Sequence, residues 1–215
     1  MLASNMLRTG IALAIFALVG TALLAITYEV TKERIAEEHR LVTLRTLGEL
    51  VPDTLYDNDM IADSFSVIAP EYLGDAEQKL IYRARKGEKN IAAVISATAR
   101  DGYSGNIYML VAINNDGKLL GVRIVGHKET PGLGDGIDIQ RSNWITAFDG
   151  RSLTNPDRHG WAVKKDGGVF DQLTGATITP RAVVKAVHKC LQYFEKHKTL
   201  IFSAPSKQLI DDTTS

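Results

Sequence analysis

The chain has 215 residues, and its 25 lysines and arginines balance its 25 aspartates and glutamates, so the formal net charge is zero. This length allows a membrane anchor and one domain of ordinary size, and the charge balance disfavours a nucleic-acid partner, which normally requires a basic excess. The single cysteine, Cys190, excludes an internal disulfide and a cysteine-built metal or iron–sulfur site.

A short flank, residues 1–9, precedes an uncharged run of 19 residues, Gly10–Tyr28. At about 1.5 Å per residue this run roughly matches a hydrocarbon core about 30 Å thick. A cleaved signal peptide is the alternative, but its apolar region would be shorter and a small-x-small cleavage site would follow it. The residues after the run, Ile26–Glu29, provide no such site. We therefore predict a retained transmembrane helix at residues 10–28.

The segment from residue 29 to 78 connects this helix to the rest of the chain. We expect the helix to continue from Glu29 to about Leu50 and to end at Val51-Pro52, because the residue before a proline avoids the helical region. The stretch Asp53–Gly74 has no sustained hydrophobic period, and we interpret it as a loop with short elements.

Hydrophobic residues alternate with polar ones from Lys79 onward, which is the period of a β-strand. The connections between the alternating runs are short and have turn compositions, including an Asp-Gly pair. Short connections join antiparallel neighbours, so the sequence predicts a four-stranded meander. Its strands are the run that begins at Lys79, and then Ile91–Ala97, Ile107–Ile113 and Leu119–Val125.

The meander leads into Gly126–Gly136, where Pro131 precedes three glycines within five residues. Such bare backbone can approach a flat ligand closely, but a chain reversal that needs positive φ angles explains the glycines equally well. Farther on we predict a short helix at Ile139–Phe148 and a strand at Trp161–Lys164. Both tryptophans, Trp144 and Trp161, are interpreted as core anchors.

The stretch Asp171–Arg181 leads into the last long helix, which we expect to run from Pro180 to about His197. Thr179 suits the N-cap and Pro180 the first helical position. Free amides at such a helix start suit a phosphate, although ordinary capping explains the Thr-Pro pair alone. Cys190 lies on the apolar face of this helix and is interpreted as a small core side chain. The tail, residues 201–215, is polar and is expected to be loose.

Two of these stretches resemble a known family. Asp171-x-x-Thr174-Gly175-Ala176-Thr177 resembles the flavinylation motif of the FMN-binding domain found in the G subunit of Rnf complexes and in the C subunit of the sodium-pumping NADH:quinone reductase. The resemblance implies an α+β fold with the domain at residues 79–200. It also implies FMN bound to Thr177 through a phosphoester, and recognition of Asp171, Thr174, Gly175 and Ala176 by a flavin transferase.

Glu129-Thr130-Pro131-Gly132-Leu133-Gly134 resembles the second characteristic stretch of that domain. The resemblance implies that Thr130, Gly132, Leu133 and Gly134 lie against the flavin, with Glu129 as a hydrogen-bond partner at its edge. Near the phosphate we expect Thr179, the first-turn amides and Arg181, whose charge would offset that of the phosphodiester.

The order of these segments is similar to that of the Rnf G subunit, the shorter of the two. The resemblance implies a bacterial inner-membrane protein with one transmembrane helix, a periplasmic domain and other Rnf subunits as partners. It implies a redox subunit of a translocase that couples electron transfer between ferredoxin and NAD to ion transport. The counts of lysine and arginine beside the apolar run do not themselves place the domain outside.

The residues themselves contain no nucleophile–base pair and no histidine cluster of metal spacing, so we predict no catalytic residue and no metal site. That pattern suits an electron carrier, because a flavin supplies the redox chemistry and the protein supplies position and charge. Two alternatives remain open: a covalent-FMN subunit of a different reductase, and an anchored binding module without redox function.

Overall fold

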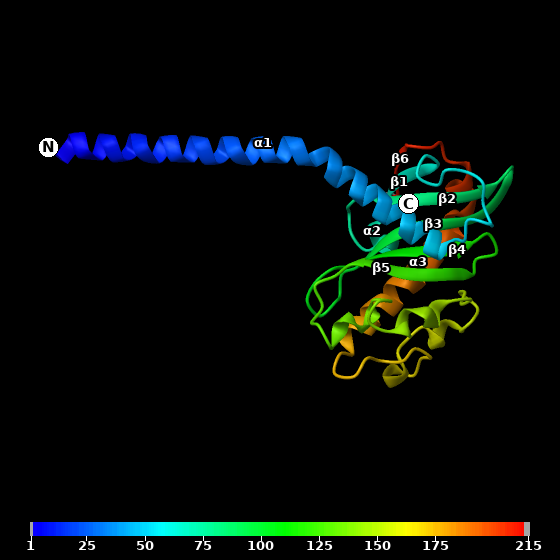
Figure 1. Ribbon diagram of the computed structural model, residues 1–215. Coiled ribbons are helices and arrows are strands. Elements are labelled where there is room, and N and C mark those ends of the chain that lie inside the picture. The colour runs from blue at the N-terminus through cyan, green and yellow to red at the C-terminus, as the bar shows by residue number, and fades with distance from the viewer. Residues whose placement is uncertain (1, 213–215) are drawn as a thin grey trace. The chain divides into compact units, whose positions relative to one another are not determined.

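The computed structural model describes residues 2–212 (Figure 1). Met1 and residues 213–215, the outermost parts of the predicted flank and tail, lie outside the described residues. So do the side chains of residues 2–7, 9, 12, 33–40 and 42. The chain divides into two compact units, Met1–Arg45 and Thr46–Ser215. The predicted domain, residues 79–200, lies inside the second unit.

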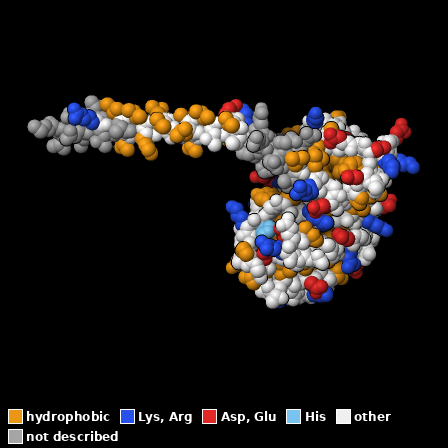
Figure 2. Space-filling view, in the orientation of Figure 1, with side chains coloured by type: hydrophobic (Ala, Val, Ile, Leu, Met, Phe, Trp, Pro, Cys, Tyr) orange, Lys and Arg blue, Asp and Glu red, His pale blue; other side chains and the backbone are white. Residues whose placement is uncertain are grey.

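The first unit is helical throughout its described length. The helix α1 runs without interruption from Leu2 to Leu50 and contains both the predicted anchor and the predicted helical extension. Its segment Leu13–Lys32 is long and apolar enough to cross a membrane, and Figure 2 shows hydrophobic side chains along it. The hydroxyls of Thr21 and Thr27 each donate to the carbonyl four residues back at 2.8 Å, so they add no unpaired polar group to the span.

A six-stranded sheet with the order β5-β4-β3-β2-β1-β6 forms the centre of the second unit. The predicted antiparallel meander is confirmed as four of its strands, β2 (Lys79–Lys86), β3 (Lys89–Ala99), β4 (Ile107–Asn114) and β5 (Leu119–Gly126).

Two strands lie in segments that were expected to be irregular. β1 (Ser64–Ile68) pairs antiparallel with β2, and β6 (Leu209–Asp211) pairs parallel with β1. The prediction of a loose tail is therefore wrong at β6, where the amide of Ser66 donates to the carbonyl of Gln208 at 2.8 Å. Together with the flanking helices, the sheet confirms the predicted α+β class.

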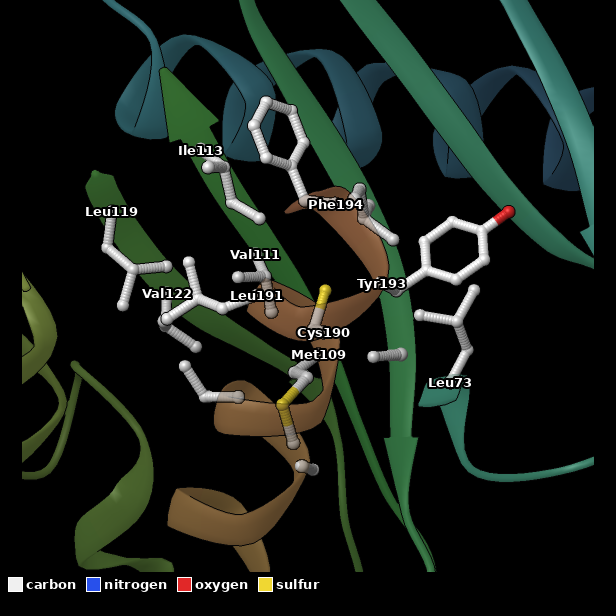
Figure 3. Close-up of a cluster of buried hydrophobic side chains, with 14 of the residues drawn as sticks. Leu73, Met109, Val111, Ile113, Leu119, Val122, Cys190, Leu191, Tyr193 and Phe194 are labelled. Carbon is white, nitrogen blue, oxygen red and sulfur yellow. The ribbon is translucent and has the colours of Figure 1, made fainter. Parts of the chain in front are cut away.

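The helix α3 (Ile178–Ser203) packs on one face of the sheet and forms most of the core with it (Figure 1). Cys190 is completely buried there, as predicted. Figure 3 shows side chains of α3 facing those of β4: Cys190, Leu191 and Phe194 on the helix, and Met109, Val111 and Ile113 on the strand. The opposite face of the sheet is covered by the end of α1, where Leu47 and Leu50 pack on Tyr82, Val94 and Leu110.

Short elements fill the remaining connections. They are α2 (Pro70–Leu73) and the 3₁₀ helices η1 (Gly134–Ile137), η2 (Asn143–Phe148), η3 (Arg158–Gly160) and η4 (Lys164–Asp166). The helix predicted at Ile139–Phe148 begins only at Asn143, because the hydroxyl of Ser142 accepts the amide of Trp144 and caps it there.

The strand predicted at Trp161–Lys164 is wrong. Val163 forms a single bridge with Phe170, and its carbonyl accepts the amide of Gly168 at 3.1 Å, so the chain reverses before a ladder can form. The interpretation of both tryptophans as core anchors is confirmed. Trp161 is buried beside Phe170, and Trp144 packs against the core at its edge.

Two arginines of β2 hold the C-terminal end of α3, where cations are favourable. Arg83, which is 1% exposed, pairs with Asp63 and donates to the carbonyl of Ala204. Arg85 pairs with Asp63 at 2.7 Å and donates to the carbonyl of Phe202 at 2.8 Å. Burial raises the pKa of Asp63, but the hydrogen bonds and charges of its partners outweigh burial, so this pKa lies below its ordinary value.

Candidate functional site

A cavity of about 250 Å³ opens at the start of α3. Three segments far apart in the sequence line it, and two of them are the stretches singled out in the sequence. The lining residues are Tyr103 from the β3–β4 loop, then Glu129, Thr130, Leu133 and Gly134, and finally Gly175, Ala176, Thr177, Ile178 and Thr179. The fold thus brings eight of the expected cofactor-binding residues together around one cavity, beside Tyr103 and Ile178.

The glycine-rich stretch after β5 turns around the carbonyl of Thr130. This oxygen accepts the amides of Leu133 and Gly134, each at 3.1 Å. Gly132 has a φ of +76°, a left-handed conformation that glycine adopts without steric cost. At Gly134 space is the limiting factor, because an added Cβ would lie 2.8 Å from Glu129 Oε2 and 3.0 Å from Thr179 Oγ1.

Glu129 joins all three segments of the site. Its side chain accepts the amide of Ser104 at 2.9 Å and the hydroxyl of Thr179. Only 4% of Glu129 is exposed. No lysine, arginine or histidine among the described residues forms an ion pair with it. A buried carboxylate is costly unless hydrogen bonds replace water, so these two donors fix where it lies.

The helix α3 begins at Ile178, two residues before the predicted start, and Thr177 occupies its cap position. The prediction of Thr179 as the cap is wrong, because its hydroxyl donates to Glu129 and its side chain is fully buried. Pro180 becomes the third helical residue. It is still in the first turn, where a missing N–H removes no intrahelical bond.

The two threonines of the motif, Thr174 and Thr177, lie in different surroundings. Thr177 lines the cavity with a partly buried side chain, and its hydroxyl makes no cap bond and has no other hydrogen bond within the described part of the chain. Thr174 is exposed and lines a separate depression beside Pro131 and Leu173. Gly175, with a φ of +77°, reverses the chain between them.

Asp171 and Arg181, the two charged residues of the threonine stretch expected at the site, do not line the cavity. Asp171 pairs with Lys164 at 2.6 Å, and its carbonyl accepts the indole N–H of Trp144 at 2.6 Å. Arg181 binds both carboxylate oxygens of Asp166 at 2.5 Å. The hydrogen bond from Arg181 lowers the pKa of Asp166, and the same bond raises the pKa of Arg181. The guanidinium expected to offset a phosphodiester therefore already has a carboxylate partner.

Two lining residues, Ile178 and Tyr103, were missed in the sequence analysis. Tyr103 lies in the connection between β3 and β4, which was interpreted only as a turn. Its side chain is 70% exposed at the mouth of the cavity, near the exposed side chains of Leu133 and Ile178. An aromatic residue in a turn between Gly102 and Gly105 is the one local signal that could have drawn attention to it.

Comparison with known proteins gives two matching family models, an FMN-binding domain over residues 102–192 and an RnfG N-terminal region over residues 1–50. A Pseudomonas aeruginosa protein, named as the G subunit of an ion-translocating oxidoreductase complex, is 50% identical over 194 residues, which cover 90% of this chain and 91% of that protein. Proteins with the same name from Shewanella baltica and Vibrio cholerae are 44% and 42% identical, with 93% of this chain and 94% and 95% of theirs covered.

The chain belongs to this family of G subunits. The resemblance seen in its two motifs is thereby confirmed, and every cavity-lining residue falls within the segment that matches the FMN-binding domain. A solved structure of the C subunit of a sodium-translocating NADH-quinone reductase from Parabacteroides distasonis is also similar. The TM-score is 0.47 at 20% sequence identity, covering 68% of this chain and 80% of that one.

Proposed function

We propose that this chain is the electron-carrying G subunit of an Rnf-type complex, with FMN covalently bound to Thr177 through a phosphoester. One observation carries the choice of residue. Of the threonines in the motif, Thr177 alone combines a place in the cavity with a hydroxyl that no described residue engages.

The lining and the polarity of the cavity suit such a group. Amides of the first turn of α3 have no intrahelical acceptor, and the helix dipole favours an anion near them, so they suit the phosphate of a ligand fixed at Thr177. Leu133, Ile178 and Tyr103 offer apolar contact to a flat ring. The volume of about 250 Å³ is below the usual range for a whole ligand, which favours a flavin that stays partly exposed to a partner.

A bound FMN supplies one-electron chemistry, and the protein residues bind, orient and shield it. No stand-alone catalysis is proposed for this chain, because the redox chemistry would belong to the flavin. The chain then acts as one redox subunit of a translocase, between a donor and an acceptor supplied by other subunits.

Attachment requires a separate flavin transferase that uses FAD and magnesium. The oxygen of Thr177 forms a bond to the phosphorus of the FMN half, and the bond between that phosphorus and the AMP half breaks. AMP leaves, and a base of the transferase takes the hydroxyl proton. The transferase would recognise the exposed residues of the motif, Asp171 and Thr174, together with Gly175 and Ala176.

The remaining parts of the proposal concern location. The segment Leu13–Lys32 would anchor the chain in the bacterial inner membrane with the second unit in the periplasm, beside the other Rnf subunits. In that setting electrons exchanged between ferredoxin and NAD would be coupled to sodium or proton transport. A reporter that is active only in the periplasm, fused after Ser215, tests the orientation, and a silent fusion would contradict it.

Intact mass and in-gel flavin fluorescence test the attachment. The full-length chain, co-expressed with a flavin transferase, should gain the mass of FMN less one water and fluoresce on a denaturing gel. Thr177→Ala should lose both signals, whereas Thr154→Ala, an exposed threonine outside the motif, should keep them. A label retained in Thr177→Ala would refute the acceptor, and a wild-type chain without added mass would favour an anchored module without flavin.

A further inference from the structure

Glu129 is the one carboxylate among the residues that line the cavity, and no lysine, arginine or histidine lines the cavity with it. Its two oxygens receive neutral donors only, the amide of Ser104 and the hydroxyl of Thr179. Hydrogen bonds of this kind hold a carboxylate in place without cancelling its charge. The cavity wall therefore contains a buried negative charge without a paired cation.

Two cations of α3 are engaged elsewhere, and Lys128, the residue before Glu129, has an exposed side chain. On α3, Arg181 pairs with Asp166, and Lys185 pairs with Asp101 at 2.5 Å. His127, two residues before Glu129, uses its Nδ1 to accept the Glu129 amide, so it acts as an acceptor at that nitrogen. None of these groups forms an ion pair with Glu129 among the described residues.

Two glycines make the room that this carboxylate occupies. A Cβ at Gly134 would lie 2.8 Å from Glu129 Oε2, and a Cβ at Gly102 would lie 3.0 Å from Glu129 Oε1. Both distances are shorter than ordinary contacts, so the backbone packs closely against both oxygens. At Gly102 the carbonyl of Gly105 is closer still, 2.2 Å from the added Cβ. The carboxylate is thus placed by packing as well as by hydrogen bonds.

We propose that Glu129 is a positioning residue that lowers the reduction potential of the FMN in this cavity. This inference rests on the proposed function. The cavity is small, so any ring that enters it lies close to the carboxylate. The charge opposes the arrival of an electron on that ring, and burial leaves little water to screen the repulsion. Reduced flavin is therefore destabilised relative to oxidised flavin.

Removing the charge and removing a hydrogen-bond donor should have opposite effects. Glu129→Gln keeps the shape and abolishes the charge, so the flavin should become easier to reduce. Thr179→Val keeps the charge but removes the hydroxyl that partly offsets it. The flavin in that variant should become harder to reduce than in the wild type. A purely structural bridge between loops would not produce two shifts of opposite sign.

The measurement is a spectroelectrochemical titration of the full-length protein, loaded by co-expression with a flavin transferase and held in detergent. In Glu129→Gln the ratio of reduced to oxidised flavin at a fixed applied potential should rise at least tenfold, which is about 59 mV for a one-electron step. Glu88→Gln, the same change at an exposed residue of the β2–β3 turn, should titrate like the wild type.

Three results separate the outcomes. If flavin-loaded Glu129→Gln has the same reduction potential as Glu88→Gln, the inference is refuted and Glu129 is only a structural bridge. If Glu129→Gln does not load with flavin, Thr179→Val decides the matter, and an unchanged or raised potential there would refute the inference. A wild-type chain that takes up no flavin would refute the proposed function instead, and the inference with it.

Discussion

Gly134→Ala is the sharpest test of how the site is packed. Its φ is not left-handed, so the backbone accepts an alanine there, and only space is at issue. The new methyl group would lie 2.8 Å from Glu129 Oε2, 3.0 Å from Glu129 Cβ and 3.0 Å from Thr179 Oγ1. Because both neighbours are buried and bonded to each other, neither can move without weakening that bond.

Overpacking of this kind costs typically 1–3 kcal/mol of unfolding free energy. For a unit of this size each kcal/mol lowers Tm by about 2–4 °C, so the expected decrease in Tm is roughly 2–12 °C. Thermal unfolding of the flavin-free, full-length protein, followed by the fluorescence of Trp144 and Trp161, measures it. Both tryptophans pack against the core of the second unit, so the signal reports on that unit.

Gly126→Ala is the matched control, eight residues earlier at the end of β5. A Cβ there would meet the side chain of Tyr108 at 3.5 Å, an ordinary contact, so the change in unfolding free energy should stay within about 0.5 kcal/mol. Equal Tm values for Gly134→Ala and the wild type would refute the claim that Gly134 is kept small by Glu129 and Thr179. Equal decreases in Tm in Gly134→Ala and Gly126→Ala would indicate that the loss comes from replacing a glycine in the backbone, and not from the contact with Glu129 and Thr179.

Three further substitutions and one labelling experiment test other parts of the structure. The folded pKa of Asp63 is depressed, so its contribution is complete above the unfolded value, about 3.9, and is lost as pH falls through the folded pKa. Asp63→Asn should flatten that acid dependence and, by leaving Arg83 buried without its carboxylate, cost about 3–5 kcal/mol in urea unfolding at neutral pH. Gly48→Ala should stabilise the second unit by about 0.5–1 kcal/mol in the same assay, because its Cβ would meet only Asp53 Oδ1 at 3.7 Å inside a helix. Burial raises the pKa of the Cys190 thiol, so a thiol reagent should label it in denaturant and leave the native protein unlabelled. Tyr103→Ala should keep the covalent flavin but lower its fluorescence anisotropy, since apolar contact at the mouth is lost.

The sequence predicted the meander because each strand alternates cleanly and each connection is a recognisable turn. It could not predict β1 and β6, because these two strands pair with each other across a large separation in the sequence. β6 has three residues, and its ladder partner β1 is more than 140 residues earlier in the chain, so neither segment has a local pattern that requires a strand. The strand predicted at Trp161–Lys164 was wrong for the opposite reason. The segment has the local composition of a strand but no neighbouring strand long enough to pair with it.

At the site, local patterns located both motifs but not the contacts between them. The glycine-rich stretch and the threonine stretch are recognisable letter by letter, and both line the cavity. The bond from Thr179 to Glu129 spans 50 residues, and the bond from Ser104 to Glu129 spans 25. No spacing within either motif indicates such bonds. Tyr103 was missed for the same reason, because its place at the mouth follows from the position of its loop.

The mistaken helix start and the choice of Thr177 have one cause. Thr179 would be a good cap if nothing competed for its hydroxyl. Glu129 is buried, however, and a buried carboxylate without a hydrogen-bond donor is costly, so the hydroxyl donates to Glu129 instead. The cap position therefore falls on Thr177, whose hydroxyl makes no cap bond and remains available at the cavity. The hydrogen bond from Thr179 to Glu129 thus has two consequences. It holds the negative charge of Glu129 beside the proposed flavin, and it leaves the hydroxyl of Thr177 available for attachment of that flavin.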